Sequence, residues 1–353
     1  MEIFTCILML LAGCGVFMIG MKMMSDGLER SAGKEMKKLF NHLTGNRFAG
    51  VGIGALVTVI VNSSSASTVM TIGLVNAGVI TLTQAASIIM GANIGTTLSG
   101  FVISLSSLNI NLYASLLAFI GIMMTFFTND NVKKTGGILC GLGLMFVGLE
   151  SMGGAFSGES AITDSVKHAF EVVDFPLLLI LIGMAFTGII QSSTATTGLV
   201  IIMVGAGAMR VDSGLFVILG TNIGTCVTAI IASIGTNTNS RRTAFFHLLF
   251  NVVGTIIFTA IIWIFRTPVV NVLSHLGGPQ WQIAWFHFSF NLITTAILLP
   301  FINQFVKITE FIVRDKPAKK EEEFRFRYID DRLLSTPPIA VAQVQKEIMY
   351  ASE

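Results

Sequence analysis

Residues 62–68 read Asn-Ser-Ser-Ser-Ala-Ser-Thr and residues 191–197 read Gln-Ser-Ser-Thr-Ala-Thr-Thr, two polar runs inside long apolar stretches. They align without a gap at a shift of 129 residues, from 63 to 192. The same shift aligns Gly-Ala-Asn-Ile-Gly-Thr-Thr at 91–97 with Gly-Thr-Asn-Ile-Gly-Thr-Cys at 220–226. Upstream, glycines 13, 15 and 20 match glycines 141, 143 and 148 at a shift of 128. Two polar motifs that recur at one shift indicate an internal duplication.

The composition is typical of a polytopic membrane protein. Of the 353 residues, 53% are hydrophobic and only 12% charged, and the mean hydropathy is +0.77. Too few charges are present to wet the surface of a soluble fold, and the chain is far too apolar to be disordered. The net charge of +2 comes without a basic stripe, which excludes nucleic acid as a partner. The four cysteines lie singly, so neither a disulfide framework nor a metal centre is predicted.

Charged loops predict the topology, because basic residues favour the cytoplasmic side. Basic residues dominate 22–47, 133–134, 241–242 and the tail from 307, whereas 150–174 is acidic. These signs agree only if two apolar segments, 50–77 and 176–206, enter and leave on one side. Each is then a re-entrant hairpin, the first opening from the cytoplasm and the second from outside. Seven other segments cross, with the N-terminus outside and the C-terminus cytoplasmic.

The predicted fold class is therefore an all-α polytopic membrane protein with two inverted-topology repeats, each carrying a re-entrant helical hairpin and a discontinuous helix. The first repeat covers 1–134, with its hairpin at about 50–77 and a broken helix at about 84–108. The second covers 135–306, with its hairpin at about 176–206, a broken helix at about 213–235 and two further membrane helices. Inverted repeats with interrupted helices are typical of secondary transporters.

The hydroxyl runs predict a binding site for an anion. Ser, Thr and Asn are poor residues inside helices and good helix caps, so each run predicts a turn between two short helices. The N–H groups at a helix N-terminus attract anions. The alternative is that these hydroxyls only bridge neighbouring helices. The Gly-x-Asn-x-Gly-Thr motifs are interpreted as further breaks whose amide, hydroxyl and carbonyl oxygens could bind Na⁺, with tight helix packing as the alternative.

The hairpins and glycine motifs contain no Lys, Arg, Asp or Glu. A helix end supplies only about half a charge, so two of them cannot neutralise a divalent anion. Cations bound alongside it by neutral oxygens could do so, which favours a small oxyanion carried with Na⁺. His247 and His287 are the only candidates for a proton relay and are more typical of hydrogen-bonded packing residues.

These paired motifs resemble the type II sodium-dependent phosphate cotransporters and their bacterial relatives, over roughly residues 10 to 306. The resemblance implies Na⁺-coupled uptake of inorganic phosphate across a bacterial-type inner membrane, no cofactor and no metal beyond Na⁺, and it leaves a homodimer open. It assigns phosphate binding to Ser63, Ser64, Ser65, Gln191, Ser192, Ser193 and Thr194. It assigns Na⁺ binding to Asn62, Ser67, Thr68, Asn93, Thr96, Thr196, Asn222 and Thr225. The sequence departs from the family pattern at Asn62, Thr194 and Cys226.

The tail at 307–353 resembles the start of a PhoU-like domain, most clearly over 328–340. Because the chain stops at Glu353, about one helix into that domain, we expect a truncated cytoplasmic domain.

Three other functions remain open. A symporter of another oxyanion such as sulfate uses the same chemistry. An intramembrane serine hydrolase would use Ser64 or Ser193 with His247 or His287 as the base. No Gly-x-Ser-x-Gly elbow surrounds either serine, so the chain is predicted not to be an enzyme. A channel usually needs an oligomeric axis, whereas an inverted repeat allows alternating access within one chain.

Overall fold

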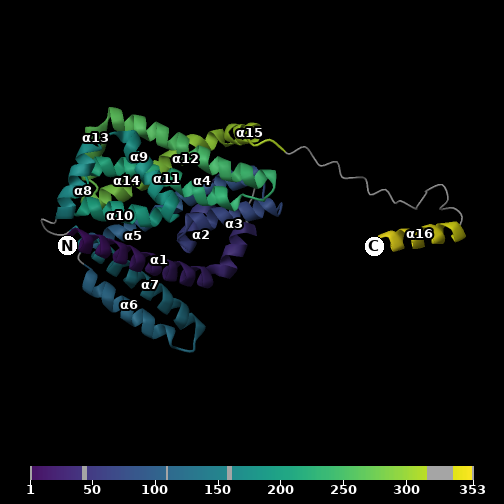
Figure 1. Ribbon diagram of the computed structural model, residues 1–353, viewed down its shortest axis with the longest axis horizontal. Coiled ribbons are helices and arrows are strands. Elements are labelled where there is room, and N and C mark those ends of the chain that lie inside the picture. The colour runs from purple at the N-terminus through teal and green to yellow at the C-terminus, as the bar shows by residue number, and fades with distance from the viewer. Residues whose placement is uncertain (1, 42–45, 109, 157–160, 316–336, 352–353) are drawn as a thin grey trace. The chain divides into compact units, whose positions relative to one another are not determined.

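A computed structural model describes residues 2–41, 46–108, 110–156, 161–315 and 337–351. Over these residues every regular element is a helix (Figure 1). The chain divides into two units, Met1–Val313 and Arg314–Glu353, and the described part of the second unit carries one helix, α16 (Pro337–Ala351). The α-helices of the first unit are α1 (Glu2–Asn41), α2 (Arg47–Val61), α3 (Ser64–Asn76), α4 (Leu82–Thr96), α5 (Leu98–Ser104), α6 (Asn111–Thr125), α7 (Asp130–Gly154), α8 (Ala161–Val172), α9 (Pro176–Ile190), α10 (Ser193–Gly205), α11 (Val211–Ala232), α12 (Thr238–Ile264), α13 (Arg266–Ser274), α14 (Pro279–Leu298) and α15 (Ile302–Ile312).

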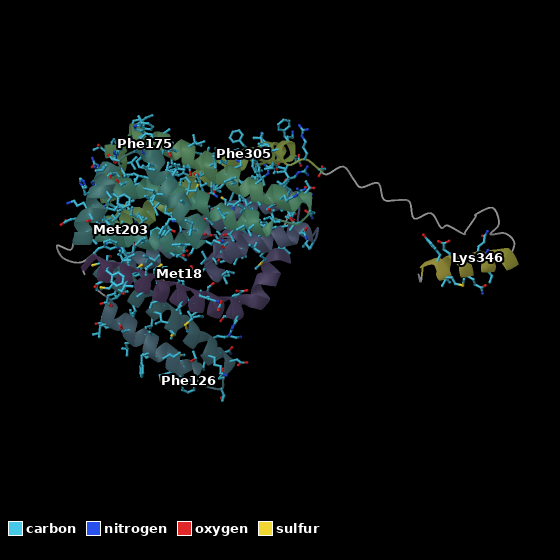
Figure 2. The ribbon with its side chains drawn as sticks, viewed as in Figure 1. Met18, Phe126, Phe175, Met203, Phe305 and Lys346 are labelled. Atoms are coloured by element: carbon cyan, nitrogen blue, oxygen red, sulfur yellow. The ribbon has the colours of Figure 1, made fainter. Side chains whose placement is uncertain are left out.

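Six helical spans in the described residues are long and apolar enough to cross a membrane, judged by length and composition. They begin at Phe4, Leu82, Asp130, Val211, Thr238 and Pro279. The expected seventh crossing segment is α6, which is apolar but shorter. Large apolar side chains face outward, among them Phe126 at 75% exposure, as Figure 2 shows at the turn after α6. Such a surface suits lipid and not water.

Glycines join α1 to α7, which lie side by side with α6 beyond them (Figure 1). A Cβ built on Gly13 would lie 2.8 Å from the carbonyl oxygen of Gly148, and one on Gly148 would lie 2.6 Å from that of Gly13. Gly20 and Gly141 face each other in the same reciprocal way, at 2.6 and 2.5 Å. Because rising numbers on α1 meet falling numbers on α7, the two helices run antiparallel. Only residues without a Cβ allow this approach.

The glycine motifs bring two further helix pairs into backbone contact. A Cβ on Gly91 would lie 1.9 Å from the carbonyl oxygen of Val51, so α4 packs directly on α2. In the second copy a Cβ on Gly220 would lie 2.0 Å from the carbonyl oxygen of Ile180, so α11 packs likewise on α9. The two residues of the second contact, Gly220 and Ile180, each lie 129 positions after their counterparts in the first, Gly91 and Val51. The duplication is thus repeated in the packing, contact by contact.

The prediction that these motifs unwind their helices at the glycines is wrong, although the helix expected to be broken at about 84–108 is interrupted at Thr97. The helix is continuous from Gly91 to Gly95 in α4 and from Gly220 to Gly224 in α11. The broken helix expected at about 213–235 is one unbroken helix, α11. The one expected at about 84–108 is interrupted only after its motif, where α4 meets α5 and the 3₁₀ turn η1 (Leu105–Leu108). The glycines serve close packing and leave the helical hydrogen bonds in place, which is why no break occurs at the glycines.

This packing makes a prediction for two glycines of α2. A Cβ on Gly54 would lie 2.0 Å from the carbonyl oxygen of Ile88, whereas Gly52 has nothing within 4 Å. We expect Gly54→Ala to lower the free energy of unfolding by about 2 kcal/mol or more, because the backbones must separate. Gly52→Ala should be neutral or slightly stabilising, since alanine is the better helix former. Thermal unfolding of both purified variants checks this, and equal melting temperatures would contradict the packing.

The last helix of the first unit, α15, ends later than the start expected for the tail. The tail was predicted to begin at 307, but α15 continues to Ile312, and the first unit ends at Val313. Ile302, Val306 and Thr309 are buried along one face of α15, so this helix packs on the body as an amphipathic element. Residues 316–336, which include most of the PhoU-like stretch, lie outside the described residues.

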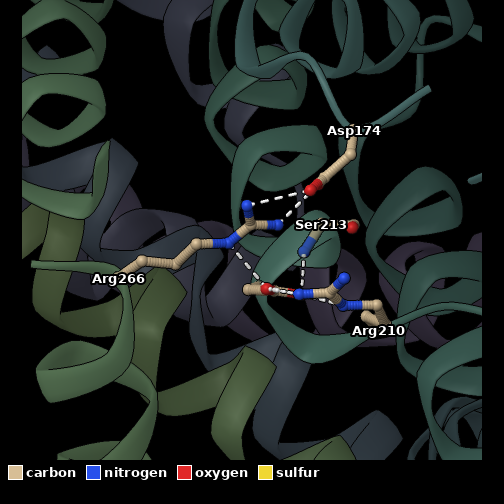
Figure 3. A network of polar contacts seen from close by, with 5 residues as sticks. Asp174, Arg210, Ser213 and Arg266 are labelled. Atoms are coloured by element: carbon tan, nitrogen blue, oxygen red, sulfur yellow. Dashed lines mark hydrogen bonds and ion pairs between the residues drawn. The ribbon is translucent and has the colours of Figure 1, made fainter. Parts of the chain in front are cut away.

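An ionic network ties three helix starts together (Figure 3). Arg266, the first residue of α13, donates to both carboxylate oxygens of Asp174 before α9, at 2.5 and 3.0 Å. It also donates to Asp212 in the first turn of α11, at 2.6 Å, and Arg210 pairs with the same carboxylate. The hydrogen bond from Arg266 lowers the pKa of Asp174 below its usual value, against the opposing effect of burial. The second hairpin is thereby anchored at its base.

A pH dependence follows from the lowered pKa of Asp174. Its folded-state pKa lies below the unfolded value of about 3.9, so the contribution to stability is present above pH 4 and lost as the pH falls through the folded pKa. We expect Asp174→Asn to lower the melting temperature at pH 7 by about 2 °C, because the group is one-third exposed and its ion pair is screened. The difference between wild type and variant should shrink between pH 5 and pH 3. A difference that grew on acidification would contradict this role.

Candidate functional site

The two hydroxyl runs form two turns of the same geometry. Asn62 ends α2 and Gln191 ends α9, each in the left-handed conformation with φ of 52° and 58°. Each next residue, Ser63 or Ser192, is extended and begins the following helix. The chain thus reverses between two helices through two residues. Outside glycine, these are the only positive φ values in the described residues, and such strain is typical of functional sites.

Serine caps define what the turns can bind. The Ser63 hydroxyl accepts a hydrogen bond from the N–H of Ala66, and the Ser192 hydroxyl accepts one from Ala195, each at 3.2 Å. Each cap satisfies one backbone N–H group in the first turn of its helix. The N–H groups before it, including those of Ser64 and Ser193, have no partner in their own helix. Unpaired N–H groups at a helix N-terminus attract anions. Both turns therefore offer the same donor set.

Both turns line one cavity of about 250 Å³. The cavity brings together every residue that the sequence analysis assigned to phosphate, although the two runs lie 129 positions apart. From the first turn come Asn62, Ser63, Ser64 and Ser65, and from the second come Gln191, Ser192, Ser193 and Thr194. Ser64 and Ser193, the first residues of α3 and α10, are each more than nine-tenths buried. The space suits a small oxyanion held between two helix N-termini.

One wall of the cavity belongs to α1, which sequence reasoning placed elsewhere. The wall consists of Phe17, Met18, Met21, Lys22, Ser25 and Asp26. The Ser25 hydroxyl donates to the carbonyl of Val61, the last residue of α2, and the Nδ2 atom of Asn62 lies 3.9 Å from the Sδ atom of Met21. Lys22 and Asp26 were interpreted as loop charges. The helical spacing of the six positions on α1 is the signal that could have found this wall.

Most of the residues assigned to Na⁺ lie away from the cavity. Of the eight, only Asn62 lines it, and its Oδ1 accepts a hydrogen bond from Ser99 at 2.8 Å. Ser67 and Thr196 lie one turn deeper and donate to the carbonyls of Ser63 and Ser192, at 3.0 and 3.1 Å. Asn93, Thr96, Asn222 and Thr225 lie on α4 and α11, where both threonines donate to carbonyls of their own helix.

Two buried hydroxyls without a partner stand out at equivalent positions. The Oγ1 atoms of Thr68 and Thr197 are buried, and neither has a hydrogen-bond partner among the described residues. Each residue is 2% exposed. The sequence analysis chose Thr68 and missed Thr197, although the shift of 129 residues leads from one to the other. An unpaired buried hydroxyl oxygen is costly unless something binds it.

The two histidines contact the glycine motifs and not the serines. The Nε2 atom of His247 lies 3.4 Å from Oδ1 of Asn93, and that of His287 lies 3.4 Å from Oδ1 of Asn222. Both rings are at least 98% buried. Within the described residues, no hydrogen bond joins either ring to Ser64 or Ser193. Neither histidine is therefore placed to act as the base of a serine nucleophile at the cavity in this structure.

Comparison with known proteins identifies the family. The sequence model of the Na⁺/Pi-cotransporter family matches residues 16–154 and 159–301, which together make up most of the chain. This chain belongs to the Na⁺/Pi-cotransporter family. The resemblance inferred from the motifs is thus confirmed for the family, and transport of phosphate across a membrane follows from it. Each of the two matched segments of the chain contains one hairpin turn and one glycine motif.

The proteins that are similar to this chain differ in length and in the function that their names state. The protein YqeW of Bacillus subtilis, named as uncharacterized, is 29% identical over 86% of this chain and 96% of its own length. The Escherichia coli K12 protein named "Putative inorganic phosphate export protein YjbB" is 26% identical over 97% of this chain and 62% of its own length. The human sodium-dependent phosphate transport protein 2B is 30% identical over 46% of this chain and 24% of its own length. No solved structure was found to match the chain.

Proposed function

We propose that the protein is a Na⁺-coupled symporter of inorganic phosphate, in which the two hairpin turns hold the anion between them. The observation that carries this proposal is the single cavity lined by both turns. Phosphate would accept from the free N–H groups at the starts of α3 and α10 and from the hydroxyls of Ser64, Ser65, Ser193 and Thr194. The Gln191 amide faces the same space. It offers the oxygen that a protonated phosphate can donate to and that sulfate cannot use.

Sodium is the counter-charge in this proposal. Two helix N-termini supply about one positive charge in total, and the hairpins add none. We assign Na⁺ to the oxygens next to the turns, those of Asn62, Ser67, Thr68 and Thr196, and add Thr197 because its hydroxyl has no partner. Asn93, Thr96, Asn222 and Thr225 form a deeper set on the helices that pack against the hairpins. Neutral oxygens of this kind suit a hard monovalent cation.

Alternating access between inverted repeats is the proposed mechanism. The reciprocal glycine contacts of α1 and α7 support this mechanism. Two equivalent membrane helices that pack antiparallel are related by a two-fold axis that lies in the membrane plane. The hairpins α2–α3 and α9–α10 would then be re-entrant from opposite sides. Their four helices have 13 to 15 residues each, short of the roughly 20 that a crossing needs.

Location and direction complete the proposal. The protein would lie in a bacterial-type inner membrane with its N-terminus outside and its C-terminus cytoplasmic, and it would take up phosphate because the Na⁺ gradient points inward. The relative named for phosphate export supports the opposite direction as a second candidate. The tail after Val313 would begin a PhoU-like domain. A homodimer is compatible with the apolar surface. We propose no enzymatic activity and no cofactor.

Reciprocal binding tests the coupling. We expect Na⁺ to raise the affinity of the purified protein for radiolabelled phosphate, and phosphate to raise its affinity for Na⁺ by the same factor. Choline replaces Na⁺ in the control, and sulfate is the competing anion. Phosphate affinity that is equal in Na⁺ and choline would remove the counter-charge argument. If sulfate displaced the radiolabelled phosphate as effectively as unlabelled phosphate does, the protein would instead be assigned as a symporter of other oxyanions.

A further inference from the structure

The wall that α1 contributes to the cavity changes character along the helix. Its six positions, 17, 18, 21, 22, 25 and 26, form one stripe at helical spacing. The first three, Phe17, Met18 and Met21, are apolar, and Phe17 is only 1% exposed. The last three, Lys22, Ser25 and Asp26, are polar. The α1 wall of the cavity therefore runs from an apolar end at Phe17 to a charged end at Lys22 and Asp26, which we call the rim.

The rim carries one charge of each sign, four residues apart on the same helix face. Lys22 is exposed and Asp26 is half-buried. Neither side chain makes an ion pair or a hydrogen bond with another described residue. Lysine placed before the acidic residue is also the weaker order for a pair within a helix. Both charges are thus available to ligands that pass the rim.

The rim is fixed next to the anion-binding turn. The Ser25 hydroxyl, between the two charged residues on the stripe, donates to the carbonyl of Val61, one residue before the turn at Asn62. On the other side of α1, Gly20 and Gly27 pack directly against α7. The helix is held from both sides, so the charges keep their place beside the first hairpin.

We propose that Lys22 and Asp26 form an entry and exit site for a phosphate–sodium ion pair, in which Lys22 contacts the phosphate and Asp26 contacts the Na⁺. The proposal rests on the function proposed above and adds two residues outside both hairpins. A rim with one positive and one negative group is complementary to an anion and a cation that arrive together. It attracts a lone ion of either sign less, because the second charge repels it.

Equilibrium binding to the purified full chain separates the two roles. Phosphate is titrated at saturating Na⁺, and radiolabelled Na⁺ is titrated without phosphate. We expect Lys22→Gln to weaken phosphate binding about tenfold and not to weaken Na⁺ binding, since the repulsion between Lys22 and a lone cation is removed. Asp26→Asn should weaken Na⁺ binding by a similar factor and leave phosphate binding at saturating Na⁺ unchanged. Lys22→Arg should keep wild-type affinity. Lys307→Gln on α15, which lies outside the cavities that Lys22 and Asp26 line, should change neither.

The results of these titrations distinguish a failure of the rim proposal from a failure of the proposed phosphate transport. Both rim variants binding both ions like the wild type would overturn it. So would identical defects in Lys22→Gln, Asp26→Asn and the double variant, because that pattern indicates a structural pair that acts as one unit. If the wild-type chain binds no phosphate even in saturating Na⁺, the function proposed above fails first. Because both residues lie at the surface of the cavity mouth, a normal melting temperature is expected for every variant.

Discussion

Replacing Ser64 or Ser193 by alanine is expected to reduce phosphate transport by tenfold to about a hundredfold while the protein stays folded. Each residue begins a hairpin helix and lines the shared cavity. Neither hydroxyl has a hydrogen-bond partner among the described residues, so each is free to donate to the anion. A hydrogen bond to a charged group is worth about 1.5 to 3 kcal/mol, which corresponds to the expected loss.

Stability and transport should separate in these two variants. Alanine is a better helix residue than serine, and no protein contact of the hydroxyl is lost, so the melting temperature should not fall. Ser63→Ala and Ser192→Ala offer the contrast, because loss of a helix cap costs about 1 kcal/mol. Ser274→Ala, on the exposed part of α13, serves as the control for handling. Normal uptake by both Ser64→Ala and Ser193→Ala would contradict the assignment of the cavity.

Gln191→Gly is expected to stabilise the fold and to impair transport. The backbone of Gln191 has a φ of 58°, a conformation that costs a residue with a side chain about 1 kcal/mol or more and costs glycine almost nothing. The glutamine side chain is exposed to the cavity. We propose that the amide serves the ligand, which would explain why a residue with a side chain stands at this strained position. Phosphate affinity should fall about tenfold.

A conservative variant sharpens this test. Gln191→Asn keeps an amide and tolerates the left-handed conformation, so its affinity should lie between those of the wild type and the glycine variant. At the equivalent position, Asn62→Gly relieves similar strain but also removes the hydrogen bond from Ser99, so its stability should change little. A glycine variant at 191 with wild-type transport would show that the side chain has no role in the site.

The duplication, the two hairpin turns and the residues that both turns bring to one cavity could be predicted, because polar runs in an apolar chain are costly and therefore informative. Ser63 and Ser192 are cap residues by type, and they cap α3 and α10 as expected. The family is confirmed by comparison. Inverted topology, re-entrant hairpins and the Na⁺ residues stay predictions.

The glycine motifs and α1 show where a single sequence was not enough. Glycine permits both an unwound turn and the close approach of two backbones, and only the position of Val51 opposite Gly91 decides between them. The end of the apolar run near Lys22 and Asp26 predicts that both are loop charges, yet α1 continues to Asn41. Lys22 and Asp26 line the cavity because of tertiary packing, which the sequence pattern alone does not reveal.

Uptake of radiolabelled phosphate into proteoliposomes, with an inward Na⁺ gradient and with choline in its place, tests the central claim most directly. The account predicts uptake that requires the Na⁺ gradient, resists excess sulfate and is lost in the double variant Ser64→Ala/Ser193→Ala. A Na⁺ gradient imposed in the opposite direction should drive phosphate out of preloaded vesicles. Phosphate flux that is the same in Na⁺ and choline would contradict the account, and the two buried histidines would then be tested for proton coupling.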